Sequence, residues 1–160
     1  MGRFFLAEYN VATLKAPLDA PESIAFRDAL DQINALGEAQ PGFIWRAVGE
    51  GFDSATPAAD QDPFYIVNLS VWESAEALAA FAYRTEHRLY VRHREDWFHR
   101  RPGPAYVLWW IPEGHVPTDV EGEARLAELT AFGSTERAFD FANRFPPPSS
   151  PQATQARTPT

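Results

Sequence analysis

Three polar side chains in the middle of the chain have types and spacing that suit proton-transfer chemistry. Asn68 lies in the apolar run FYIVNLSVW, which predicts a buried strand over residues 64–72. His87 and Arg94 follow in a segment predicted to be helical, and seven residues are close to two turns, so both would share a face. We predict that His87 removes an acidic proton, while Asn68 and Arg94 hold the resulting oxyanion.

Each of these residues also has a purely structural interpretation. Asn68 could bond a neighbouring loop or helix end, because an amide in a buried strand must find partners. His87 could bond a nearby carboxylate or carbonyl. Arg94 could form a salt bridge with Glu86 or with a carboxylate just after it in the sequence. The sequence leaves both interpretations open for all three.

Aromatic side chains would form the walls of a pocket for a flat molecule. Asn68 and Trp72 are four residues apart, so they point to the same face of their strand. Trp109 and Trp110 point to opposite faces, and we favour Trp110 for the pocket and Trp109 for contact with a partner subunit. The predicted substrate-binding residues are Trp45, Trp72, Tyr83, Trp97 and Trp110.

The elements that would position these residues follow a β-α-β-β-α-β order. Strands are predicted over residues 4–13, 42–49, 64–72 and 105–111 and helices over 22–39, 74–82, 85–100 and 118–132, with a further short helix possible over 134–145. This order is typical of the ferredoxin-like α+β fold, an antiparallel sheet with helices on one face. The last helices would be a C-terminal addition to that fold.

The sheet of such a fold would leave its second face bare in a monomer. Because large apolar side chains occupy both faces of the predicted strands, we expect a homodimer that packs two sheets together, as in a dimeric α/β-barrel. Residues 1–145 are predicted to form this domain. Residues 146–160, rich in Pro, Ser and Thr, are predicted to be a disordered tail.

Composition excludes several classes of function. A formal net charge of -8 argues against nucleic-acid binding, and the absence of cysteine excludes disulfides and thiolate chemistry. No leader or membrane-spanning segment is visible, so we expect a cytoplasmic protein that does not bind membranes. His93 and His99 lie well round the helix from His87 and are expected to face solvent. No metal, nucleotide or flavin motif appears, so we predict no cofactor, with haem ligation by one histidine as an alternative.

The chain resembles a family of domains of unknown function within the dimeric α/β-barrel superfamily, in the stretches INALGEAQPGFIWR, VNLSVWESAEALAAFAYRTEHRLYVRHREDWF and AYVLWWIPEGHVPT. That superfamily includes the antibiotic biosynthesis monooxygenases, which oxidise or rearrange aromatic polyketide-like substrates without metal or flavin. Those enzymes often place an Asn and a Trp four residues apart at the third strand, a spacing that Asn68 and Trp72 match.

The resemblance implies a small-molecule enzyme similar to cofactor-independent monooxygenases. It would oxidise, isomerise or cyclise a flat, largely apolar substrate, with Trp72 and Trp45 packing the ring. Two alternatives remain: a haem-binding protein, and a non-catalytic ligand-binding or structural dimer whose aromatic residues are simply core. A small-molecule ligand is the expected partner in the first of these interpretations.

Overall fold

A four-stranded antiparallel sheet forms the centre of the protein, in a computed structural model that describes residues 2–49, 52, 62–85 and 87–149. The strands lie in the order β2-β3-β1-β4. This order and the succession β1-α1-β2-β3-α2-β4 are those of the ferredoxin-like α+β fold, as predicted. The bounds are β1 Phe4–Thr13, α1 Ile24–Ala39, β2 Phe43–Arg46, β3 Tyr65–Trp72, α2 Ala75–Arg84 and β4 Tyr106–Pro112.

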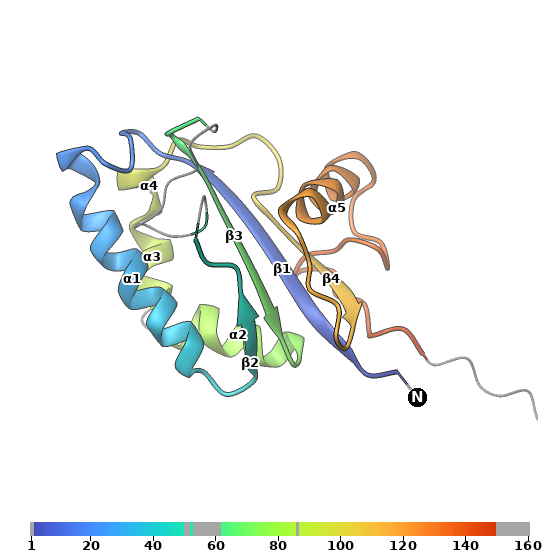
Figure 1. Ribbon diagram of the computed structural model, residues 1–160. Helices are drawn as coiled ribbons and strands as arrows, with labels where there is room; N and C mark the ends of the chain where they lie inside the picture. The colour runs from blue at the N-terminus through green and yellow to red at the C-terminus, as the bar shows by residue number, and fades with distance from the viewer. Residues whose placement is uncertain (1, 50–51, 53–61, 86, 150–160) are drawn as a thin grey trace, which may run out of the picture.

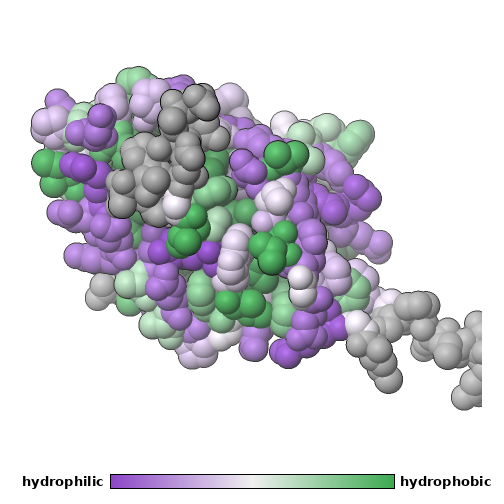
Figure 2. Space-filling model, in the orientation of Figure 1, coloured by the Kyte–Doolittle hydropathy of each residue, from purple (hydrophilic) through white to green (hydrophobic). Residues whose placement is uncertain are grey.

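The helices lie on both sides of this sheet (Figure 1). The helices α1 and α2, with the short helices α3 (His87–Arg92) and α4 (Arg94–Trp97), lie on one side, and α5 (Asp119–Phe132) lies on the other. Figure 2 shows hydrophilic side chains over the outer surfaces of α1 and α5, and hydrophobic ones gathered nearer the centre of the same face. Among the described helices, none is long and apolar enough to cross a membrane.

Side-chain caps begin two of the helices where the sequence predicts them. The Ser74 hydroxyl accepts a hydrogen bond from the backbone N–H of Ala77 at 3.1 Å, at the start of α2. The Thr118 hydroxyl accepts from the N–H of Glu121 at 3.2 Å, at the start of α5. Both bonds satisfy donors that a helix start leaves without partners.

The predicted continuous helix over residues 85–100 is wrong. The chain is extended at Thr85, which ends α2, and the Thr85 hydroxyl donates to the carbonyl of Phe81 and accepts from the N–H of His87. A second interruption at His93 separates α3 from α4. A threonine hydroxyl can replace a backbone partner, and these two bonds do so at the turn after α2.

The two faces of the sheet have different coverings. We call the side with α1–α4 the cavity face, since a cavity lies there, and the other side the second face. The second face is closed by α5 and by side chains near β2. Trp45 and Tyr65 on this face are partly buried. Most of its strand residues are fully buried, namely Phe5, Ala7, Tyr9, Val11, Val67, Leu69, Val71, Val107, Trp109 and Ile111.

Hydrogen bonds fasten α5 to this second face. The Tyr9 and Tyr65 hydroxyls both donate to the same oxygen of Glu123, at 2.8 and 2.9 Å. The Trp109 indole donates to Glu121 at 3.0 Å, so Trp109 contacts α5 and not a partner subunit. The expected bare face is therefore wrong, because a helix of the same chain buries it. A homodimer stays a prediction, but it does not follow from an open sheet.

The segment after α5 differs from the predicted short helix over residues 134–145. Phe139 instead makes two backbone hydrogen bonds with Leu108, at 2.8 and 2.9 Å, along the outer edge of β4. The segment thus continues the sheet by one bridge and covers the β4 end of the cavity face. Of the predicted tail, residues 150–160 lie outside the described residues.

Replacing Gly122 with alanine should destabilise the fold, although alanine favours a helix. A Cβ at this position would lie 2.5 Å from two carbons of the Tyr9 ring, which is buried and bonded to Glu123. We expect Gly122→Ala to lower the free energy of unfolding, measured in urea, by about 1 kcal/mol or more. Gly37→Ala in α1 is the control, because its Cβ would meet Phe81 at an ordinary 3.4 Å. Equal gains in stability from both changes would contradict close packing of α5 on Tyr9.

Candidate functional site

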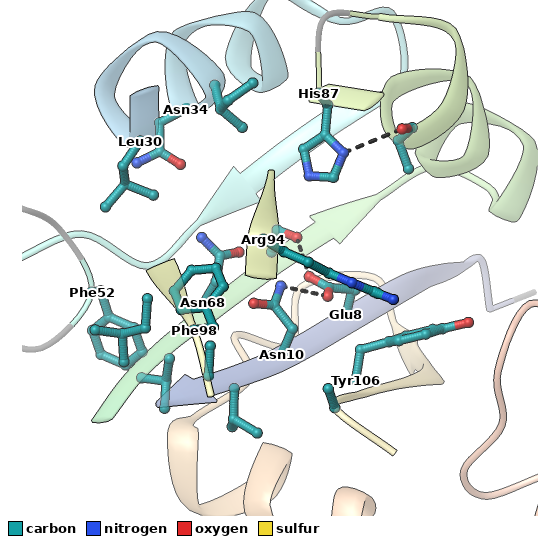
Figure 3. Close-up of a pocket in the computed structure, with 18 of the residues that line it drawn as sticks. Glu8, Asn10, Leu30, Asn34, Phe52, Asn68, His87, Arg94, Phe98 and Tyr106 are labelled. Carbon is teal, nitrogen blue, oxygen red and sulfur yellow. Dashed lines mark hydrogen bonds between the residues drawn. The ribbon is translucent and has the colours of Figure 1, made fainter. Parts of the chain in front are cut away.

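A cavity of about 1090 Å³ lies between the cavity face of the sheet and the helices α1–α4 (Figure 3). Its floor comes from β1 and β3, and its walls come from the helices and from Tyr106 at the start of β4. Much of the wall is apolar, including side chains of Leu30, Ile33, Ile66, Leu78, Phe81 and Phe98. A hollow of this size and lining suits a small organic molecule.

Four polar residues occupy neighbouring positions on the floor, and we call them the polar floor: Glu8, Asn10, Asn68 and Ser70. The strand register explains their meeting, because Glu8 is directly opposite Ser70 and Asn10 is directly opposite Asn68. Residues two apart on one strand point to the same face, so all four point into the cavity. Figure 3 shows the labelled members, Glu8, Asn10 and Asn68, side by side on β1 and β3.

The acidic group of the polar floor is the Glu8 carboxyl. The residue is buried, with only 8% of it exposed. The Asn10 amide donates to one of its oxygens at 2.7 Å, and the Ser70 hydroxyl donates to the other at 3.2 Å. The same Ser70 oxygen accepts from the Trp72 indole at 2.9 Å. A chain of bonds from Trp72 through Ser70 therefore orients the carboxyl.

Burial raises the pKa of the Glu8 carboxyl to about 7, although the hydrogen bonds from Asn10 and Ser70 favour its ionised form. The physical cause is loss of solvation, since water stabilises a carboxylate more than two neutral donors do. A carboxyl with this pKa exchanges protons readily at neutral pH. Such a group is suited to act as a general acid or base.

Asn68 points into the cavity with a half-buried side chain. Among the described residues, its amide has no hydrogen-bond partner, unlike that of Asn10. The described residues therefore show no bond from Asn68 to a loop or helix end, which was its structural interpretation. Its amide can bind a ligand oxygen through its N–H groups.

His87 lines the cavity from the helical side, where its ring lies 4.8 Å from that of Phe81. Its Nδ1 is 3.2 Å from the carbonyl oxygen of Ala82. Because a carbonyl only accepts, Nδ1 is the donor in this contact. Burial lowers the pKa of His87 and so favours the neutral imidazole, although the Ala82 carbonyl acts in the opposite direction.

Arg94 lines the cavity from α4, and Figure 3 shows its guanidinium extended over the polar floor on the side of Tyr106. Among the described residues, no carboxylate forms an ion pair with it. The nearby Glu95 instead pairs with Arg100, at 3.7 Å, and Asp96 contacts His93, at 3.2 Å. The guanidinium is therefore available to an anion in the cavity.

Only two of the five predicted aromatic residues line this cavity. Trp72 does so, stacked on Phe81 with ring centroids 5.2 Å apart, and Tyr83 does so at an exposed position. The other three do not line the cavity, contrary to the prediction. Trp45 packs on the second face, Trp97 packs against Phe26, and Trp110 donates to the Phe145 carbonyl beneath the C-terminal segment.

In the part of the chain that the structure describes, no three His, Cys, Asp or Glu side chains lie close enough together to hold a metal ion. His93 is exposed, as predicted. His99 is also exposed, yet it lines the mouth of the cavity. Haem ligation needs only one histidine and stays an untested alternative.

Sequence reasoning missed Glu8 and Asn10, which form half of the polar floor. The run FFLAEYNVAT predicts a strand over residues 4–13, and its largely apolar composition does not by itself indicate a site. The available signal is that its two strongly polar side chains, at positions 8 and 10, have the same parity and would point to one face. A strand buried on both faces that places a carboxyl and an amide side by side indicates a site.

The stability of the fold should depend on pH through Glu8. The folded state binds the Glu8 proton more tightly than the unfolded chain, so this group favours folding below about pH 4.5 and that contribution is lost as the pH rises to about 7. Relative to Glu8→Gln, the wild type should therefore lose about 3 kcal/mol over this range. Urea unfolding of both proteins at several pH values measures the difference. A constant difference between the two proteins would contradict the raised pKa.

Comparison with known proteins places this chain in a family. Its sequence matches the model described as "Domain of unknown function (DUF3291)" over residues 5–156, which confirms the predicted resemblance. No curated protein matches the sequence.

The solved structures that are similar to the chain include the following three. A protein of unknown function from Nitrosomonas europaea has 9% identity and a TM-score of 0.48, with 72% of this chain and 95% of that chain covered. The "Putative antibiotic biosynthesis monooxygenase from Nitrosomonas europaea" has 19% identity and a TM-score of 0.46, with 72% and 93% covered. The protein PA3566 from Pseudomonas aeruginosa has 16% identity and a TM-score of 0.45, with 71% and 95% covered. By the match along nearly its whole length, the chain belongs to the DUF3291 family of domains of unknown function.

Proposed function

We propose that this protein is a small-molecule enzyme that removes a proton from a flat, largely apolar substrate. The observation that supports it most is the Glu8 carboxyl, which is buried at the floor of the cavity and has a pKa of about 7. Glu8 thus replaces His87 as our first choice of general base. An ionised Glu8 at neutral pH would accept a proton from an acidic C–H or O–H bond above it.

The other residues of the cavity have roles in the same step. When the proton moves to Glu8, the electron pair of the broken bond stays on the substrate as an enolate or phenolate. The Asn68 amide and the Arg94 guanidinium can stabilise that oxyanion, since both are donors without partners among the described residues. Asn10 and Ser70 are positioning residues, because they touch the Glu8 carboxyl.

His87 has a second possible role on the opposite side of the cavity. Burial favours its neutral form, so the imidazole could receive or return a proton at another substrate atom. Two titratable groups on different walls would permit proton transfer between two positions of one molecule. Isomerisation and cyclisation need such a transfer, and a deprotonated flat substrate is also the species that a cofactor-independent monooxygenase would present to O₂.

Hydrogen–deuterium exchange tests this proton abstraction without knowledge of the natural substrate. 2-Tetralone is a suitable probe, because it is flat, apolar and has acidic C–H bonds beside its ketone. We expect the protein to accelerate exchange in D₂O, followed by proton NMR, and Glu8→Gln to lower the acceleration about 100-fold or more. His87→Gln should have a smaller effect if Glu8 is the base.

Glu113→Gln is the matched control for this experiment, since Glu113 is exposed and does not line the cavity. It should exchange the probe at the wild-type rate. Wild-type exchange rates in both Glu8→Gln and His87→Ala would sink the proposal. A Soret band on titration with haem, lost in His87→Ala, would favour the haem-binding alternative instead.

A further inference from the structure

Cationic side chains are concentrated around the cavity, in contrast to the rest of the chain. Among the described residues, five Lys or Arg and four Asp or Glu line it. The whole chain has 14 Lys or Arg against 22 Asp or Glu, which gives the net charge of -8. An acidic protein therefore places a balanced or slightly positive surface at this cavity, which favours anionic ligands.

Three of the five cations have no carboxylate partner in the described part of the chain. Arg46 pairs with Glu38 at 2.6 Å, and Arg100 pairs with Glu95. By contrast, Lys15 donates to the carbonyl of Glu95 at 2.6 Å and Arg101 donates to the carbonyl of Pro104 at 3.1 Å. A carbonyl accepts a hydrogen bond but does not neutralise the charge. These two cations remain uncompensated at the rim of the cavity.

Arg94 is the third, and it differs in having neither a carboxylate nor a carbonyl partner among the described residues. Its guanidinium lies over the polar floor in Figure 3, with the Tyr106 ring to one side. The planar fork of a guanidinium matches the two oxygens of a carboxylate. The remaining wall is apolar, from Leu30 and Ile33 on α1 to Leu78 and Phe81 on α2.

We infer that the cavity binds a flat molecule with one carboxylate, that Arg94 pairs with this carboxylate, and that the apolar wall of α1 and α2 packs its ring. The inference names the substrate class of the proposed enzyme and so rests on the proposed function. It assigns Arg94 to the carboxylate and leaves the Asn68 amide to hold the oxyanion formed by proton abstraction. A monoanion fits better than a dianion, because the Glu8 carboxyl faces the same space and would oppose a second negative charge. Lys15 and Arg101 would attract the anion to the mouth of the cavity.

Calorimetric titration with 2-naphthoate and its neutral analogue 2-naphthamide tests this inference. The wild type should bind naphthoate about tenfold or more tightly than naphthamide, since a hydrogen bond to a charged group is worth that factor. Arg94→Gln should abolish the preference by weakening naphthoate alone. Raising the salt concentration should reduce the preference in the wild type, because the site is partly open to solvent.

Arg92→Gln is the matched control, because Arg92 is exposed, lies two residues away and does not line the cavity. The Arg92→Gln change removes the same charge and should leave the affinities for naphthoate and naphthamide unchanged. An unaltered thermal unfolding midpoint in Arg94→Gln would show that the variant is folded. Equal affinities for the two probes in the wild type, equal effects of the two arginine changes, or no binding of naphthoate would each overturn the inference.

Two further results distinguish this inference from a phosphate-binding site and from the proposed proton abstraction. Tighter binding of 2-naphthyl phosphate than of 2-naphthoate would overturn the assignment of a carboxylate in favour of a phosphate. Glu8→Gln should still bind naphthoate, since Glu8 is proposed to act on a proton and not on the carboxylate. Binding without any exchange of 2-tetralone would leave this inference standing and remove only the proposed proton abstraction.

Discussion

The buried carboxyl of Glu8 is the interaction on which the rest of the site depends. A carboxyl on a central strand would ordinarily be expelled to solvent, because burial without compensation is costly. Here Asn10 and Ser70 donate to its two oxygens, and Trp72 donates in turn to Ser70. These bonds hold the group in place without restoring the solvation of its charge, and its pKa consequently rises to about 7. The Glu8 carboxyl is thus held in a fixed orientation and is close to its protonation midpoint at neutral pH.

Closure of the second face by α5 determines what the cavity face can do. Hydrogen bonds from Tyr9 and Tyr65 to Glu123, and from Trp109 to Glu121, join α5 to the sheet. Because these contacts bury the apolar residues of the second face, the fold does not need a second sheet to cover it. The strands are then packed firmly on one side, while the polar residues on the other side remain directed into the hollow. A rigid sheet beneath the site favours a fixed geometry of its polar groups.

The secondary structure around the site could be predicted from local sequence, whereas the composition of the site could not. Period-two alternation located the strands, and Ser74 and Thr118 marked two helix starts correctly. The spacing from His87 to Arg94 suggested one continuous helix. His93 interrupts it, and the two residues nevertheless reach the same cavity. Strand parity placed Asn68 and Trp72 together. Parity also assigned Trp110 to the pocket side of β4, but residues 139–145 return and cover that end of the strand, so Trp110 does not line the cavity.

The sequence by itself determined the order of the elements, the ferredoxin-like fold and the face to which each strand residue points. These depend on local periodicity and capping, which neighbouring residues specify. Tertiary structure alone decided that Glu8 meets Ser70 and that Asn10 meets Asn68, since 62 residues separate Glu8 from Ser70 and pairing across strands depends on register. It also decided that α5 covers the second face. Burial, and with it the raised pKa of Glu8, exists only after these distant segments have packed together.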